Sequence, residues 1–210
     1  MTDTDLLSEI QTVLMEPPDG GVTWTSGLWT ATEVLNRFNE RQNRFLKATR
    51  MLVGESSPIP VTAGESVYDL PQDWLTTVDV YWAGEDGTFR TLVRSDSFEA
   101  DHGMPLWEST AGTPLLYMDE DSPLLTITIA PIPRVNGILT VLYVPQAGVQ
   151  QGLGDPLGVP DEYATADKYG TLADLFGKDG RGASPERAQY AELRYQLDQE
   201  IAKIMIEGWC

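Results

Sequence analysis

The side chains that most often carry chemistry are scarce in this sequence. One histidine, His102, stands between an aspartate and a glycine, and one cysteine, Cys210, is the last residue. Serine–histidine–acid triads, paired-histidine metal sites and zinc clusters each need more of these residues than the chain has. We interpret His102 as a solvated loop residue, and Cys210, with no base near it in sequence, as a poor nucleophile. We therefore expect no enzyme, no cofactor and no metal.

Two further stretches have some of the residues of a ligand site. Residues 119–121 are Asp-Glu-Asp, but they lack the alternating ligands and central glycine of an EF-hand, so an acidic turn is favoured over a weak surface calcium site. Residues 177–182 (GKDGRG) superficially resemble a phosphate loop. Their lysine comes too early and they follow a predicted helix instead of a strand, so we predict a connection between two helices.

Basic residues are concentrated in one short segment of a very acidic chain. The net charge is −18 and the pI about 4.2, yet residues 30–54 hold five basic residues against Glu33 and Glu40. The five fall three or four apart, so they form one stripe of a helix. These are Arg37, Arg41, Arg44, Lys47 and Arg50. The stripe is either the solvated back of an amphipathic helix or a contact surface, and reversing Arg41 and Arg44 to glutamate is expected to leave the fold intact.

Tryptophans offer a different kind of site. Trp74, Trp82 and Trp107 could stack on sugars, although the apolar strand patterns around Trp74 and Trp82 favour core packing. A carbohydrate-binding β-module is therefore retained as the alternative function. Recognition of a nucleic-acid sequence is disfavoured, because an acidic protein repels phosphate.

Four helices are predicted to position these residues, near 4–15, 30–53, 160–176 and 184–207. Apolar residues recur at helical spacing in each of them. Thr30 and Glu33 form a capping-box pattern, and Ser184-Pro185-Glu186 places a cap, an N1 proline and an acid at the start of the last helix. The apolar residues of that last helix are expected on one face. They are Tyr190, Leu193, Leu197, Ile201, Ile204 and Met205.

The middle of the chain, from Ser56 to about Val149, reads as short strands and turns. Residues 77–82 and 89–93 are predicted to form a hairpin, and residues 114–118 and 124–130 another across the acidic turn. Pro131 and Pro133 end a strand, and the Asn-Gly pair at 136–137 predicts that the chain returns directly as an antiparallel strand.

Together these patterns predict an α+β fold. We expect both chain ends, residues 1–55 and 150–210, to form an antiparallel helical bundle, with residues 56–149 inserted as a β-sandwich or barrel-like unit. No apolar run is long enough for a membrane helix, and the acidic start of the chain does not predict a secretory signal. The single cysteine fits synthesis in a reducing cytosol.

Four stretches of the chain carry distinctive features in a fixed order. They are WTATEVLNRFNERQNRFLKATR (29–50), YDLPQDWLTTVDVYW (68–82), LTITIAPIPRVNGILTVLYV (125–144) and VPDEYATADKYGTLADLF (159–176). They contain a Leu-Pro-x-x-Trp strand start, a Pro-x-Pro hairpin, and a Pro-x-x-Tyr helix before a long last helix. In this order the segments resemble the head-to-tail adaptor (connector, or tail-tubular) proteins of tailed bacteriophages, and the resemblance covers nearly the whole chain from Trp24.

This resemblance implies a structural role in the virion neck. It implies a homo-oligomeric ring, usually of twelve subunits, between the portal protein and the next component, which is a tail tube, nozzle or further neck protein. Double-stranded DNA would pass through its lumen without sequence-specific binding, and no membrane is involved. The protein would be made in the host bacterial cytoplasm. An acidic DNA mimic is a further alternative.

Trp209 is the last candidate contact residue. It follows Gly208, a plausible end of the last helix, and a large aromatic side chain there is either idle or docks on a partner. The resemblance implies the portal as that partner.

Overall fold

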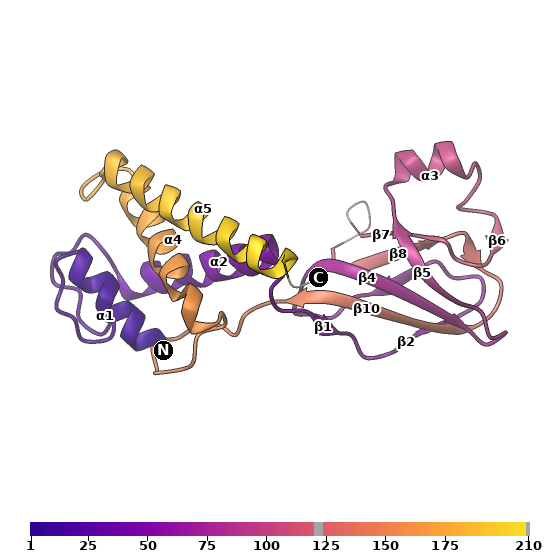
Figure 1. The fold of residues 1–210 in the computed structure, drawn as a ribbon, viewed down its shortest axis with the longest axis horizontal. Helices are drawn as coiled ribbons and strands as arrows, with labels where there is room; N and C mark the ends of the chain where they lie inside the picture. The colour runs from indigo at the N-terminus through magenta and orange to yellow at the C-terminus, as the bar shows by residue number, and fades with distance from the viewer. Residues whose placement is uncertain (120–123, 209–210) are drawn as a thin grey trace. The chain divides into compact units, whose positions relative to one another are not determined.

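The computed structural model describes residues 1–119 and 124–208, which fold as two compact units. Residues 1–51 and 146–210 belong to the first unit, and residues 52–145 to the second. Figure 1 shows helices in the first unit and a strongly curved sheet in the second. The α+β class is therefore confirmed, with five α-helices among the described residues and a sheet curled as a half-barrel.

The first unit is built from helices that begin and end within a few residues of the predicted bounds. They are α1 (Asp3–Val13), α2 (Ala31–Thr49), the 3₁₀ turn η1 (Asp161–Tyr163), α4 (Ala164–Gly177) and α5 (Pro185–Glu207). The Thr30 hydroxyl accepts from the Glu33 N–H at 3.2 Å, so Thr30 caps α2 as predicted, but the Glu33 carboxylate pairs with Lys178 and does not complete the capping box. Pro185 begins α5 as predicted, but the Ser184 side chain makes no capping hydrogen bond. Arg50 ends α2 in the left-handed conformation.

One hydrophobic core joins four helices of this unit. Its buried members come from α1, the Trp29 link, α2, α4 and α5. They include Leu6, Leu7, Ile10, Trp29, Val34, Phe38, Leu172, Leu175, Phe176 and Ala191. Gly170 of α4 lets the helices approach closely, because a Cβ there would lie 2.9 Å from the Tyr195 ring and 3.0 Å from Arg41.

The prediction of which face of α5 packs in the core is wrong. Ala191, Tyr195 and Ala202 are the residues of α5 that are buried, whereas the six large apolar residues from Tyr190 to Met205 are exposed. Small residues pack where helix backbones come close, so the alanine face of α5 meets α4 and its larger side chains point elsewhere.

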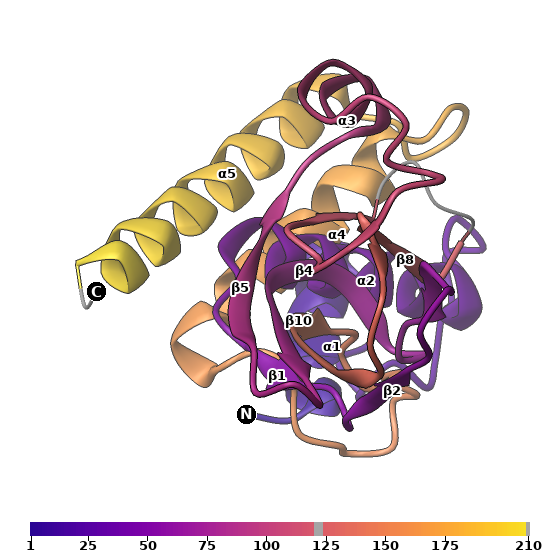
Figure 2. The ribbon, with the colours of Figure 1, turned by 90° about the vertical axis from the view of Figure 1, so that its right-hand side faces the viewer.

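The second unit is a curled sheet of eight short strands beside a two-stranded sheet. Its strands are β1 (Gly54–Glu55), β2 (Ile59–Val61), β3 (Val67–Asp69), β4 (Trp74–Gly84), β5 (Phe89–Arg94), β6 (Ala111–Gly112), β7 (Leu116–Met118), β8 (Thr126–Ala130), β9 (Ile132–Pro133) and β10 (Gly137–Pro145). The large sheet has the order β1-β10-β4-β5-β7-β8-β3, with β2 also paired to β10, and Figure 2 shows its curl. Buried side chains inside the curl include Val80, Trp82, Ile127, Ile129, Leu139 and Val141.

Two predicted hairpins are confirmed and one is wrong. β4 pairs with β5, with Val80 opposite Leu92, and β7 pairs with β8, with Leu116 opposite Ala130. β8 and β10 were expected to pair directly, but β8 lies between β7 and β3 while β10 lies between β1 and β4. Pro131 ends β8 as predicted, but Pro133 lies in the short strand β9, which pairs with β6 in parallel before β10 begins.

Gly137, at the start of β10, allows close packing against β4. A Cβ there would lie 2.6 Å from the Trp82 ring and 2.5 Å from the Ala83 carbonyl oxygen, so only glycine lets β10 pass this close to β4. The sequence did not predict α3 (Ser97–Gly103), which Asp96 caps by accepting from the Glu99 N–H.

Candidate interaction surface

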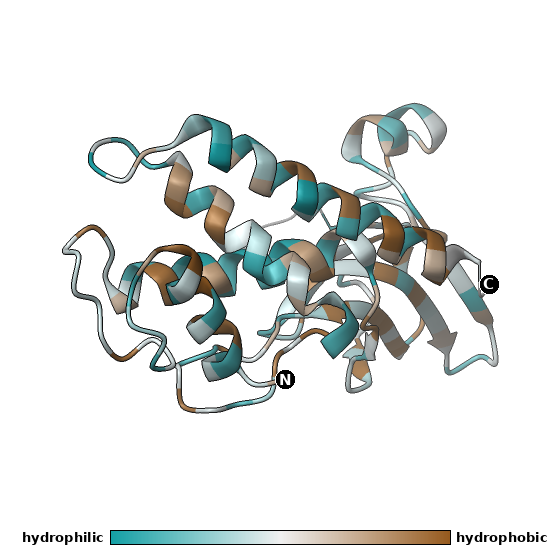
Figure 3. Ribbon diagram, turned by 60° about the vertical axis from the view of Figure 1, so that its left-hand side comes forward, coloured by the Kyte–Doolittle hydropathy of each residue, from teal (hydrophilic) through white to brown (hydrophobic). Residues whose placement is uncertain are grey.

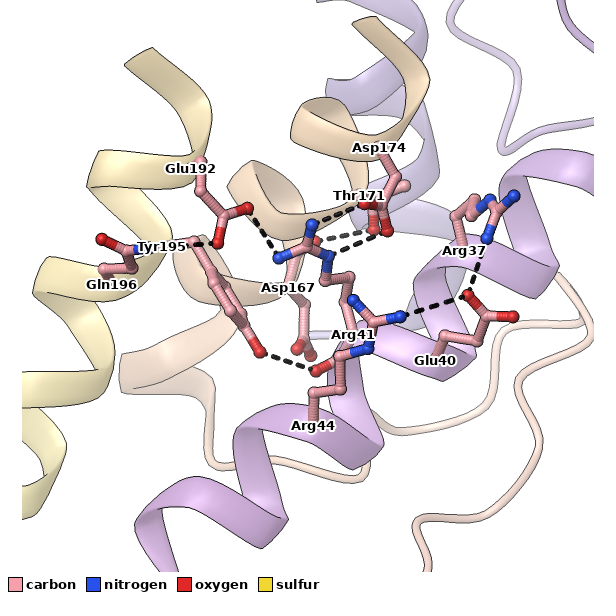
Figure 4. Close-up of polar contacts among 10 residues, drawn as sticks. All are labelled: Arg37, Glu40, Arg41, Arg44, Asp167, Thr171, Asp174, Glu192, Tyr195 and Gln196. Carbon is pink, nitrogen blue, oxygen red and sulfur yellow. Dashed lines mark hydrogen bonds and ion pairs between the residues drawn. The ribbon is translucent and has the colours of Figure 1, made fainter. Parts of the chain in front are cut away.

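Four of the five predicted stripe residues lie on the exposed side of α2. Arg37, Arg44, Lys47 and Arg50 are exposed. Arg37 donates to a carboxylate oxygen of Glu40 at 2.9 Å, and Arg44 lies 4.0 Å from the same oxygen (Figure 4). One acid shared by two arginines leaves the surface net positive. We call these four residues the basic surface of α2.

Arg41 does not belong to this surface, which corrects the expectation that all five side chains are exposed. It is buried, and its guanidinium points toward α4 and α5, where it meets two carboxylates (Figure 4). Its Nε donates to Asp174 Oδ2 at 2.8 Å, and an Nη atom lies 2.8 Å from Glu192 Oε2. Its Cζ atom lies 4.9 Å from the centroid of the Tyr195 ring. Arg41 therefore links α2, α4 and α5.

The environment of Arg41 keeps it charged. Burial alone would lower its pKa, but the hydrogen bonds and negative charges of Asp174 and Glu192 outweigh that effect, so its pKa is raised. The Tyr195 hydroxyl donates to the Arg41 carbonyl oxygen at 3.1 Å and adds a contact between α5 and α2. Burial raises the pKa of that hydroxyl, which stays a donor.

A second buried polar group, Asp167 of α4, was missed by the sequence analysis. It is fully buried, and Gln42 Nε2 donates to its Oδ2 atom at 3.2 Å. Its Oδ1 atom and Gln42 Oε1 have no hydrogen-bond partner among the described residues. Burial raises the pKa of Asp167 to about 8, against an ordinary 3.8. Protonation turns one carboxylate oxygen of Asp167 from an acceptor into a donor. The neutral acid therefore leaves fewer acceptors unsatisfied and suits this site.

The Asp167 site is structural in character. A raised pKa is common at catalytic acids, but here the group is enclosed by packed helices and no substrate in solvent can reach it. The arrangement holds helices together and offers no nucleophile.

Other candidates from the sequence have structural roles. His102 lies in helix α3, not in a loop, and its ring contacts that of Phe98 at a tilt, with ring centroids 4.2 Å apart. Lys178 donates to both carboxylate oxygens of Glu33 at 3.1 Å and lies over the Trp29 ring, so residues 177–182 connect two helices as predicted. Asp119 pairs with Arg94 at 2.9 Å, and the rest of the acidic turn lies outside the described residues.

The tryptophans of the sheet unit do not form a sugar-stacking platform. Trp82 is fully buried and Trp107 is 8% exposed. Trp74 is half-buried, and its indole N–H donates to the Thr77 hydroxyl at 3.1 Å. The rings that would stack on a carbohydrate are therefore occupied by protein contacts.

Trp209 and Cys210 lie outside the described residues. Within residues 1–119 and 124–208, no three histidine, cysteine or acidic side chains gather as a metal site. In the same ranges, no helix is long and apolar enough to cross a membrane.

Comparison with known proteins points to one family. The family model described as SU10 adaptor protein matches residues 1–207, and so spans both compact units. A search of curated proteins found no match.

Proposed function

The chain belongs to the SU10 adaptor protein family, a family of phage head-to-tail adaptors, and from this membership we propose that it is one subunit of a ring joining portal to tail. The family match over residues 1–207 carries the proposal. In this proposal the ring has twelve subunits, and its partners are the portal on one side and a tail or further neck protein on the other. DNA passes through the lumen during packaging and ejection.

The distribution of charge supports a ring. A ring needs a heterologous contact, in which one surface of a subunit meets a different surface of its neighbour. The exposed basic surface of α2 opposes the charge of residues 55–162, which hold 17 acidic residues and three basic ones. Complementary charges on two surfaces speed association and fix the register of the contact.

The acidic sequence also fits passage of DNA. A wall of carboxylates repels phosphate, so DNA slides past it without binding. We propose that acidic residues of the sheet unit face the lumen, and that the terminal helices act as an antiparallel bundle that holds neighbouring subunits.

The carbohydrate-binding alternative is weakened by the burial of Trp82 and Trp107, described above. The neck proposal is tested with a phage in which this gene is disrupted. We expect DNA-filled heads without tails, because the portal has no adaptor on which a tail can assemble, and infectivity should return when the gene is supplied in trans. Tailed, infectious particles that lack the protein would contradict the proposal.

A further inference from the structure

The last helix exposes a row of large apolar side chains. The six are 45–66% exposed; the first five recur every three or four residues and Met205 directly follows the fifth, so they lie along one side of α5. They are Tyr190, Leu193, Leu197, Ile201, Ile204 and Met205. Figure 3 shows hydrophobic residues along the length of α5. We call this row the α5 ridge.

The α5 ridge is more than the stray apolar surface that any protein has. Tyr190 and Ile204 are about 21 Å apart along the helix, at about 1.5 Å per residue. Six half-exposed large side chains in a row form a patch of roughly a few hundred Å², and the largest apolar patch on a protein surface is often functional. The alanine face of α5 already packs on α4, so the ridge is a second apolar face of the same helix.

A groove of matching character lies in the same unit. It has a volume of about 350 Å³ and is lined by side chains of α1, α4 and the start of α5, together with Met15 just after α1. Its apolar members are Val13, Met15, Tyr169, Leu172, Phe176, Tyr190 and Ala191. Met15 is 84% exposed, in a left-handed conformation. Within the described residues, no apolar side chain covers this groove.

The groove and the far half of the ridge lie at opposite ends of α5. Arg187, Tyr190 and Ala191 place the groove beside the first turns of the helix, whereas Ile204 and Met205 are in its last turn. A convex apolar row and a concave apolar groove at two separated places on one subunit are what a head-to-tail contact requires.

Charge favours the same pairing. Residues 196–206, which carry the far half of the ridge, contain Asp198 and Glu200 against Lys203 alone. The groove is bordered by Lys168, which pairs with Glu9, and by Arg187, which makes no ion pair among the described residues. Net negative charge around the ridge thus faces net positive charge around the groove.

We propose that the C-terminal half of the α5 ridge of one copy docks in the α1–α4–α5 groove of the next copy. The proposal rests on the ring of the proposed function and names the surfaces through which it closes. Leu197, Ile201, Ile204 and Met205 enter the groove, and Met15 closes over them. Arg187 meets the acidic flank of the incoming helix.

Cysteine cross-linking of assembled protein tests this contact. In a Cys210→Ser background, Met15→Cys and Ile204→Cys are combined in one chain, and each is also made alone. Because the contact is heterologous, the double variant should cross-link with a short bismaleimide into a ladder of oligomers, and each single variant should stay monomeric. Met15→Cys with Gln196→Cys, an exposed position on the polar side of α5, is the matched control and should give at least tenfold less product.

The outcomes separate this inference from the ring itself. The masses of the assemblies in each sample are first measured by mass photometry, with the protein alone and with purified portal. Rings without a ladder would overturn the α5 contact and leave the neck proposal standing. Dimers from Ile204→Cys alone would show an isologous helix pair and also overturn it. Absence of any oligomer on the portal would contradict both.

Discussion

The buried acid Asp167 gives a prediction that can be worked through from the structure. We consider Asp167→Asn, which keeps the shape of the side chain and removes its ability to ionise. Burial raises the folded-state pKa of Asp167 to about 8 from 3.8, so the native protein holds a proton that the unfolded chain releases. For an acid of this kind, stability is greatest below the unfolded pKa and falls as the pH rises through the folded pKa.

The size of the effect follows from that shift. Between about pH 4 and pH 8 each pH unit costs the wild type about 1.4 kcal/mol of unfolding free energy, so the cost at pH 7 is about 4 kcal/mol. The asparagine avoids this cost but leaves one amide hydrogen without a clear acceptor, a loss of about 1 kcal/mol. Asp167→Asn should therefore stabilise the protein by about 3 kcal/mol at pH 7 and have little effect near pH 5.

Urea unfolding followed by circular dichroism, from about pH 5 to pH 8, measures the unfolding free energy of the wild type and of Asp167→Asn as a function of pH. All other titrating groups are common to the two proteins, so the difference between the curves isolates Asp167. Asp174→Asn is the control, because its carboxylate pairs with Arg41 and losing that ion pair should destabilise the protein. Parallel wild-type and Asp167→Asn curves would refute the reasoning.

Three other predictions concern the helices. Arg41→Met should destabilise the first unit by about 3 kcal/mol in the same unfolding assay, because it leaves Asp174 and Glu192 without their partner, and an unchanged midpoint would contradict that role. Arg44→Glu with Lys47→Glu should keep the unfolding midpoint within about 1 kcal/mol of wild type but slow ring assembly on the portal, since both side chains are exposed, and assembly at the wild-type rate would exclude a contact there. Deleting residues 208–210, which include Trp209, should spare folding and weaken attachment to the portal in a sedimentation assay, and wild-type attachment would show that Trp209 is idle.

Local signals in the sequence were sufficient for most elements. The Thr30 cap, the proline at the start of α5 and the turns joining β4 to β5 act over a few residues, so they could be predicted without knowledge of distant neighbours. The pairing of β10 with β4 instead of β8 depends on contacts between residues far apart in the chain, and the Asn-Gly pair at 136–137, where β10 begins, gave no information on them.

Burial was harder to predict where two faces of one helix are apolar. In α5 the larger side chains suggested the core, but Tyr195 packs closely against Gly170 of α4, on the same face of α5 as the buried alanines. Arg41 shares the spacing of its exposed neighbours, and only the positions of Asp174 and Glu192 on other helices show that it is buried. Residues 188, 191 and 202 are alanines, and this second periodicity was the available signal for the exposed ridge.

The central claim, that this chain is a ring adaptor in a phage neck, is tested most directly by cryo-electron microscopy of the intact neck. We predict a closed twelve-subunit ring of this chain between portal and tail, with the α5 ridge of each copy against the groove of the next. A neck without this chain would contradict the claim, as would isologous dimers of it in place of a ring.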